Sequence, residues 1–114
     1  MTIARLNTEF WVRACVRRAD IEGIPIVVAH KGDPVSGSVL VKRSFRDGGC
    51  TVLAQTRDLD GNQAWYAGTG PAPVDEAAAD AYVERCRSRD RDLWVLEIDD
   101  RDGRLPFDAQ IISA

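Results

Sequence analysis

The stretch from His30 to Ser38 carries the side chains best suited to chemistry. His30 is the only histidine of the chain, and Lys31, Asp33 and Ser38 follow it closely. A histidine can act as a general base and activate a serine as a nucleophile, while a lysine attracts an anionic substrate. An ordinary loop, in which a strand-end histidine makes only local hydrogen bonds, would carry the same residues. Both interpretations stay open at this point.

Two glycines in this stretch, Gly32 and Gly37, have the spacing of a phosphate-binding P-loop. A P-loop also needs a lysine and then a serine or threonine after the second glycine, and a helix whose N-terminus faces the phosphates. Here Ser38 follows Gly37, and the next residues predict a strand. We therefore expect a structural connection between two strands.

A second charged group consists of four arginines that alternate with other residues over 85–91. Arg85 and Arg89 are candidates for binding an anionic ligand or RNA. A helix end that is solvated and salt-bridged is the alternative, because cations near a helix C-terminus interact favourably with the helix dipole. The candidate binding residues are therefore His30, Lys31, Asp33, Ser38, Arg85 and Arg89.

Neither the cysteines nor the acidic turns predict a metal site or a cofactor. Cys15, Cys50 and Cys86 are too far apart for a zinc-binding or redox CxxC pair, and the turns at 58–62 and 99–103 lack the register of a calcium loop. Cys15 and Cys86 occupy apolar helix positions, so we expect them to react slowly with thiol reagents. Cys50, at a strand start after two glycines, is expected to react fastest.

The composition is typical of a globular protein with a small negative charge. Its 114 residues fit one domain spanning residues 1–114, with 45% hydrophobic and 29% charged residues. The formal net charge of −3 disfavours binding to nucleic acid or to an anionic membrane. We find no apolar run near the roughly 18 residues of a membrane span and no signal-like start. We therefore expect a cytoplasmic protein with free thiols.

The first helical pattern begins at Thr8, a residue type that favours the N-cap, and ends at Gly23. Its apolar residues extend over roughly 240° of the helix circumference, about twice the stripe of an ordinary surface helix. Phe10 and Trp11 are adjacent and must point in different directions. We expect either a homodimer through these two residues or cover by the C-terminal tail, which carries Phe107.

The strand patterns predict an α/β fold, with α+β as the alternative. Two nearly continuous apolar runs, 24–29 and 93–98, predict strands buried on both faces. Between them, glycine-containing turns separate three further strands of an antiparallel meander, over residues 38–45, 50–56 and 63–68. A second helix starts after Asp75 and permits a crossover, and the tail over 104–113 either pairs briefly or packs loosely. We expect three layers: a mixed, mainly antiparallel sheet of about five strands with one helix on each face.

Several stretches, in their order and spacing, resemble the DUF1491 family of small alphaproteobacterial proteins. They are EFWVRACVRR at 9–18, KGDPVSGSVLVK at 31–42 and DAYVERCRSRDRDLWVLEIDDR at 80–101. The resemblance covers nearly the whole chain. It implies a cytoplasmic bacterial protein with a layered α/β fold, and it brings no catalytic positions.

The residues favour a non-catalytic binding or interaction module, because no nucleophile, base and orienting group converge in the sequence. Its partner would be an unknown small molecule or protein, or a second copy through Phe10 and Trp11. The alternative is a small enzyme that acts on an anionic metabolite through the loop from His30 to Ser38.

Overall fold

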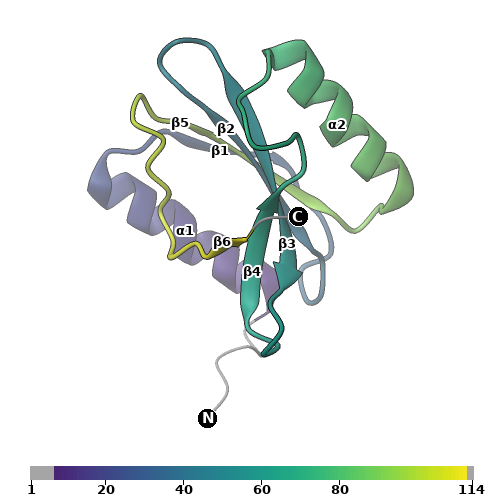
Figure 1. The fold of residues 1–114 in the computed structure, drawn as a ribbon. Helices are drawn as coiled ribbons and strands as arrows, with labels where there is room; N and C mark the ends of the chain where they lie inside the picture. The colour runs from purple at the N-terminus through teal and green to yellow at the C-terminus, as the bar shows by residue number, and fades with distance from the viewer. Residues whose placement is uncertain (1–6, 113–114) are drawn as a thin grey trace.

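A computed structural model describes residues 7–112 of the chain. Figure 1 shows a twisted sheet between two helices. The described elements are, in chain order, α1 (Thr8–Glu22), β1 (Ile26–His30), β2 (Val39–Ser44), β3 (Cys50–Arg57), β4 (Gln63–Ala67), α2 (Glu76–Arg89), β5 (Trp94–Asp99) and β6 (Ile111–Ile112).

The sheet is mixed and mainly antiparallel, as predicted, with the strand order β1-β5-β2-β3-β4-β6. β2, β3 and β4 form the expected antiparallel meander. The chain then crosses through α2, so that β5 enters the sheet parallel to β2. The described sheet has six strands rather than about five, because β6 in the C-terminal tail pairs in parallel with β4.

Each helix covers one face of the sheet, so the predicted three-layer arrangement is confirmed (Figure 1). The core under α1 is the larger and contains both buried tryptophans. It consists of Val12, Cys15, Ala19, Ile24, Val39, Val41, Leu53, Trp65, Trp94, Leu96, Ile98 and Phe107. The core under α2 consists of Leu40, Cys50, Val52, Ala54, Ala79, Val83, Leu93 and Val95.

β1 is an edge strand, so the prediction that it is buried on both faces is wrong. It pairs with β5 and ends the sheet on that side. Val27 is 59% exposed and Val28 is 38% exposed. The strand order explains the difference, because β5 rather than β1 lies between two neighbours and has the buried apolar residues of a central strand.

The ends of α1 follow from local side-chain and backbone chemistry. The N-cap is Asn7, one residue before the predicted Thr8, and its side chain accepts a hydrogen bond from the N–H of Phe10 across 2.8 Å. The hydroxyl of Thr8 instead donates to the carbonyl of Gly37. Gly23 ends the helix as predicted, with φ of 71° in the left-handed region that favours glycine.

The wide apolar arc of α1 is divided between the sheet and the C-terminal tail. The ring of Trp11 stacks on Trp65 at 5.9 Å and lies 5.2 Å from Phe107, measured between ring centroids. Phe107 is 9% exposed, so the tail covers Trp11. Phe10 stays 58% exposed. The homodimer through Phe10 and Trp11 stays a prediction, with Phe10 as its exposed member.

Candidate interaction surface

The loop between β1 and β2 is held together by its own polar groups. Oδ2 of Asp33 accepts hydrogen bonds from the N–H groups of Ser36 and Val35 at 2.8 Å and 3.1 Å. Hydrogen bonds from Ser36, above all, lower the pKa of the Asp33 carboxyl. The Asp33 carbonyl accepts from the indole N–H of Trp94 across 2.7 Å. Asp33 therefore shapes the loop, and no hydrogen bond joins it to His30 within residues 7–112.

The two glycines of the loop serve close packing against the start of β5. A Cβ atom on Gly32 or on Gly37 would collide with the carbonyl oxygen of Asp92. The N–H of Asp33 donates to that same carbonyl across 3.0 Å. The stretch is a structural connection between strands, as predicted, and its glycine spacing has a packing cause.

His30 contacts an arginine rather than a nucleophile. Its Nδ1 lies 3.1 Å from Nη2 of Arg87 on α2. Because a guanidinium only donates, Nδ1 accepts in this pair, which places the ring proton of neutral His30 on Nε2. Arg87 was not among the predicted site residues. Its position among the arginines of 85–91 was the only signal, and only the packing of α2 across the sheet brings it to His30.

The other candidates are spread over separate contacts. Nζ of Lys31 pairs with Glu9 at 3.2 Å, and Ser38 is exposed. The guanidinium of Arg85 lies over the ring of Tyr82, 5.7 Å from its centroid. Arg89 is exposed. Neither of these two arginines has a hydrogen bond or ion pair to the loop in the part of the chain that the structure describes, so the six candidates do not converge on one site.

The three thiols differ in how far they are exposed to solvent. Cys50 is 2% exposed, which contradicts the access that its expected fast reaction with thiol reagents requires. It lies in the core under α2, and a backbone bridge to Val74 covers the start of its strand. Cys15 is buried as predicted, whereas Cys86 is half-buried.

A groove of about 870 Å³ opens between the loop and the turn that joins β3 to β4. Trp11, Val35 and Val39 contribute its apolar walls. Its rim includes Thr8, next to the first described residue, so we assign no ligand to it. Its other lining residues are Ser36, Gly37, Ser38, Gln55, Thr56, Arg57, Gly61, Asn62 and Gln63.

A second groove, of about 570 Å³, lies between α1 and the edge strand. It is lined by Arg13, Val16, Arg17, Asp20, Ile24, Pro25 and Ile26. We call this groove, together with the exposed Val27 and Val28, the β1 edge surface. It combines an apolar strip with a strand that is open on one side, and β1 itself carries no lysine, arginine, aspartate or glutamate that would block pairing.

The backbone of β1 points its free groups outward at two residues. The N–H of Asp99 donates to the carbonyl of Pro25, which starts the β1–β5 ladder. In an antiparallel ladder the bonded pairs alternate, so Val27 is the next residue bonded to β5. The N–H and C=O groups of Ile26 and Val28 therefore face away from β5, and none of them has a backbone partner in another described element.

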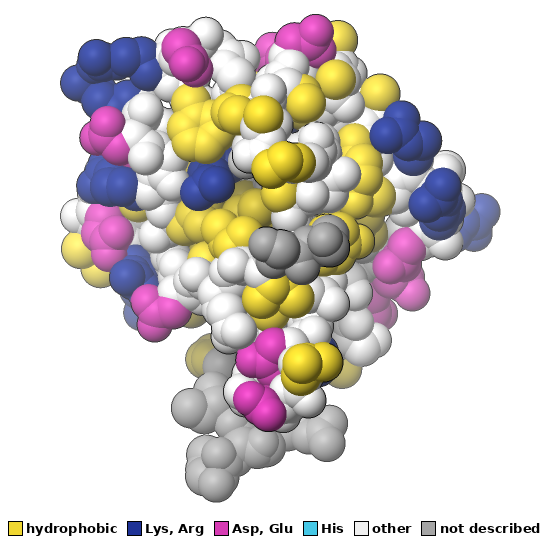
Figure 2. Space-filling view, viewed as in Figure 1, with side chains coloured by type: hydrophobic (Ala, Val, Ile, Leu, Met, Phe, Trp, Pro, Cys, Tyr) yellow, Lys and Arg dark blue, Asp and Glu magenta, His cyan; other side chains and the backbone are white. Residues whose placement is uncertain are grey.

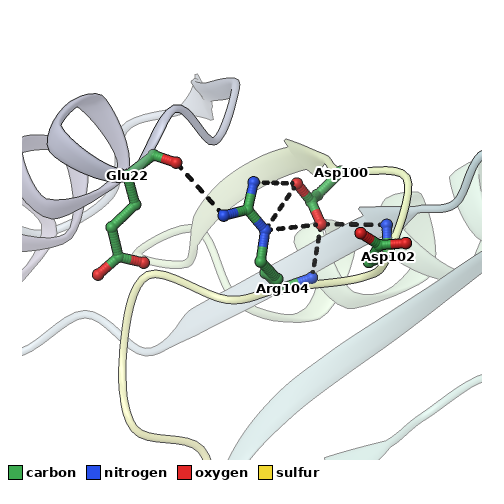
Figure 3. Close-up of polar contacts among 4 residues, drawn as sticks. All are labelled: Glu22, Asp100, Asp102 and Arg104. Atoms are coloured by element: carbon green, nitrogen blue, oxygen red, sulfur yellow. Dashed lines mark hydrogen bonds and ion pairs between the residues drawn. The ribbon is translucent and has the colours of Figure 1, made fainter.

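The opposite flank of α1 is already occupied by the tail. Arg104 donates to the carboxylate of Asp100 at 2.8 Å and to the carbonyl of Glu22, at the end of α1, at 3.3 Å (Figure 3). Hydrogen bonds from Arg104 lower the pKa of the 5% exposed Asp100 to about 2. Arg18 adds an ion pair to Asp108. The flank of α1 that faces β1 is the one left open.

The face that carries β4, β6 and the tail is also apolar. Figure 2 shows hydrophobic side chains gathered in its middle, with charged side chains mostly toward its rim. Ile111 on β6 is 46% exposed. Because this face adjoins the end of the described range at Ile112, we assign no partner to it.

The sequence model of one family, described as a protein of unknown function (DUF1491), matches residues 6–108. The chain belongs to the DUF1491 family. The match agrees with the stretches that pointed to this family. No curated protein matches the chain.

Solved structures of DUF1491 proteins share the fold. A crystal structure of a family member from Caulobacter crescentus, an alphaproteobacterium, has 38% sequence identity and a TM-score of 0.84, covering 94% of this chain and 99% of that one. An NMR structure of a DUF1491 protein from the same organism has 38% identity and a TM-score of 0.82, covering 95% and 97%. A solution structure of a protein from A. tumefaciens has 27% identity and a TM-score of 0.73, covering 96% and 99%.

Two features are absent from residues 7–112. Neither helix is both long and apolar enough to cross a membrane. In the same residues no three histidine, cysteine, aspartate or glutamate side chains gather in a way that could hold a metal ion.

Proposed function

We propose that this protein is a non-catalytic interaction module that binds a protein partner along the β1 edge surface. The open edge carries the proposal: Val27 and Val28 are exposed on a strand whose outward backbone groups at Ile26 and Val28 have no partner. Such an edge accepts a further strand through main-chain hydrogen bonds, while side-chain pockets add specificity. The three free thiols fit a reducing compartment, so the proposal places the module in the cytoplasm.

The separate contacts of the candidate chemical residues support the same proposal. His30 is paired with Arg87, Lys31 with Glu9, and Asp33 with its own loop. A catalytic serine needs a base within hydrogen-bond reach, and among the described residues no such bond joins His30 to a serine or cysteine. The competing function is an enzyme that acts on an anionic metabolite. Such an enzyme would have to break these contacts and bring the residues together around the bound substrate.

A ligand screen separates these two functions. The full chain is heated with single nucleotides and phosphorylated metabolites, and unfolding is followed by fluorescence. A ligand at about 100 times its Kd stabilises the folded state by about 2.7 kcal/mol, which raises the unfolding temperature clearly. We expect no shift. A shift that His30→Ala, Asp33→Ala or Ser38→Ala abolishes, together with turnover of that ligand, would establish the enzyme instead.

Site-specific photo-crosslinking tests the surface directly. A photo-reactive amino acid replaces Val27 in one variant and Ala77, exposed on α2, in the matched control. Both variants are irradiated in cells of an alphaproteobacterium that makes a protein of this family. We expect a protein adduct from position 27 and none of the same mass from position 77. An absence of adducts at position 27 contradicts the proposal.

A further inference from the structure

We propose that the partner of the β1 edge surface is a second copy of this chain, joined β1 to β1 in antiparallel fashion about a two-fold axis at Val27. This inference rests on the proposed function and names its partner. It would join two six-stranded sheets into one continuous sheet, with the two α1 helices side by side on one face. An isologous contact of this kind closes after two copies.

The free backbone groups define the register. The outward groups belong to Ile26 and Val28, two residues apart, so an antiparallel copy centred on Val27 sets each Ile26 opposite the Val28 of the other copy. Residues opposite each other in a bonded antiparallel pair exchange both of their N–H···O=C bonds. Every outward group of both residues is then satisfied.

A bulge in β1 limits the contact to this segment. The register with β5 shifts between Val28 and His30, so the regular alternation is interrupted before His30 pairs with Val95. A pairing centred on Val28 would place Ile26 opposite His30, beyond the bulge, and would lose the regular alternation. The centre at Val27 uses only the regular residues.

The side chains of the same register cover the exposed apolar groups. Val27 points to the face of the sheet that carries α2, where it would meet the Val27 of the other copy. In a non-bonded antiparallel pair the Cα atoms are about 4.5 Å apart and the side chains are in contact. Val28 and Ile26 point to the other face, toward α1, and would pack against each other across the axis.

The charges of the groove are self-complementary under the same symmetry. Arg13 lies in the first half of α1, Asp20 lies about two turns after it on the same flank, and Arg17 lies between them. A two-fold axis makes the two helices antiparallel, so Arg13 of one copy lies toward Asp20 of the other. Apart from Arg13, which has a long 3.5 Å contact to Glu9, these side chains have no ion pair in the described part of the chain. A basic or acidic peptide would satisfy only one of the two signs.

Sedimentation of the purified full chain, across a dilution series from tens of micromolar, tests the proposal. We expect a dimer, and Val27→Lys should weaken the association at least about tenfold, because it places two ammonium groups at the axis. Lysine at this position faces Glu97 of β5 in the same chain, so the variant gains a favourable cross-strand pair within the monomer. The control is Val35→Lys, which adds the same charge at a 68% exposed loop position and should leave the dimer intact.

Disulfide trapping tests the register independently of charge. Oxidation of V27C should give a disulfide-linked dimer, because the expected Cα separation lies within the range that a disulfide spans. V28C is the matched control, since Val28 faces Ile26 rather than itself, and peptide mapping distinguishes the new bond from the native thiols. Three outcomes would overturn the inference. The chain could sediment as a monomer, Val27→Lys could leave the dimer unchanged, or a disulfide-linked dimer could form with V28C alone. An adduct of the Val27 photo-crosslinker to a protein of another mass would overturn it while leaving the proposed function standing.

Discussion

Nζ of Lys42 on β2 donates a hydrogen bond to Oδ1 of Asp80 on α2 across 2.7 Å. A second bond, to Glu76, spans 2.9 Å, and the lysine side chain is only 6% exposed. Burial alone would lower the pKa of Lys42, but the bonds to Asp80 and Glu76 outweigh it and raise that pKa. The pair ties the first half of α2 to the sheet.

Removing both carboxylates should therefore destabilise the protein more than removing the lysine. The double variant Glu76→Gln, Asp80→Asn leaves a buried ammonium without a charged partner, and we expect a loss of roughly 2 kcal/mol. The loss stays below that of a fully buried pair because both carboxylates are more than half exposed. Lys42→Met keeps the volume without the charge and should change stability by less than about 1 kcal/mol. Urea unfolding measures both, and a more damaging Lys42→Met would contradict this account.

Phe107 should be essential for shielding the Trp11 ring from solvent. Phe107→Ala removes a buried ring that packs against both Trp11 and Trp65, so we expect a loss of about 3 kcal/mol and a red shift of the tryptophan emission. Leu59→Ala, at a fully exposed turn position, is the control and should cost less than about 0.5 kcal/mol. Unfolding and fluorescence are recorded on the same samples. Equal effects of the two substitutions would mean that the tail does not cover Trp11.

The ion pair of Asp100 should make the free energy of unfolding depend on pH in acid. Its pKa is about 2 in the folded protein, against an ordinary value of 3.8, because Arg104 and backbone N–H groups bond to the charged form. The stabilisation is therefore complete above pH 4 and is lost as the pH falls through about 2. Asp100→Asn should lower Tm by several degrees at neutral pH, and the difference from the wild type should shrink in acid. A difference that stays constant from pH 7 to pH 2 would exclude this linkage.

Cys86 should be the first thiol to react in the native protein. It is half-buried, whereas Cys50 and Cys15 are 2% and 3% exposed. Burial also raises the pKa of Cys15 to about 12, against the opposing charge of Arg18, so almost no thiolate forms near neutral pH. Labelling with a maleimide, followed by mass spectrometry of the peptides, gives the order. Cys86→Ser should remove the fast phase, and a fast phase that persists at Cys50 would restore the original expectation.

The sequence by itself determined the elements whose signals are local. The helix ends near residues 8 and 23, the start of α2 after Asp75 and the turns of the meander all appeared close to their predicted places. Each depends on interactions between neighbours along the chain, such as an N-cap side chain or a glycine with positive φ. The wide apolar arc of α1 also predicted correctly that something beyond the sheet covers part of it.

The tertiary structure alone decided which strand forms the edge and which side chains meet. The apolar runs of β1 and β5 look alike in sequence, yet β5 lies inside the sheet and β1 at its end. His30 meets Arg87 and Trp11 meets Phe107 across 57 and 96 positions of the chain. Strand order and such contacts depend on how the whole chain closes around two cores, and side-chain periodicity carries no information about the neighbour of a strand. The open β1 edge, on which the proposed function depends, is therefore visible only in the folded protein.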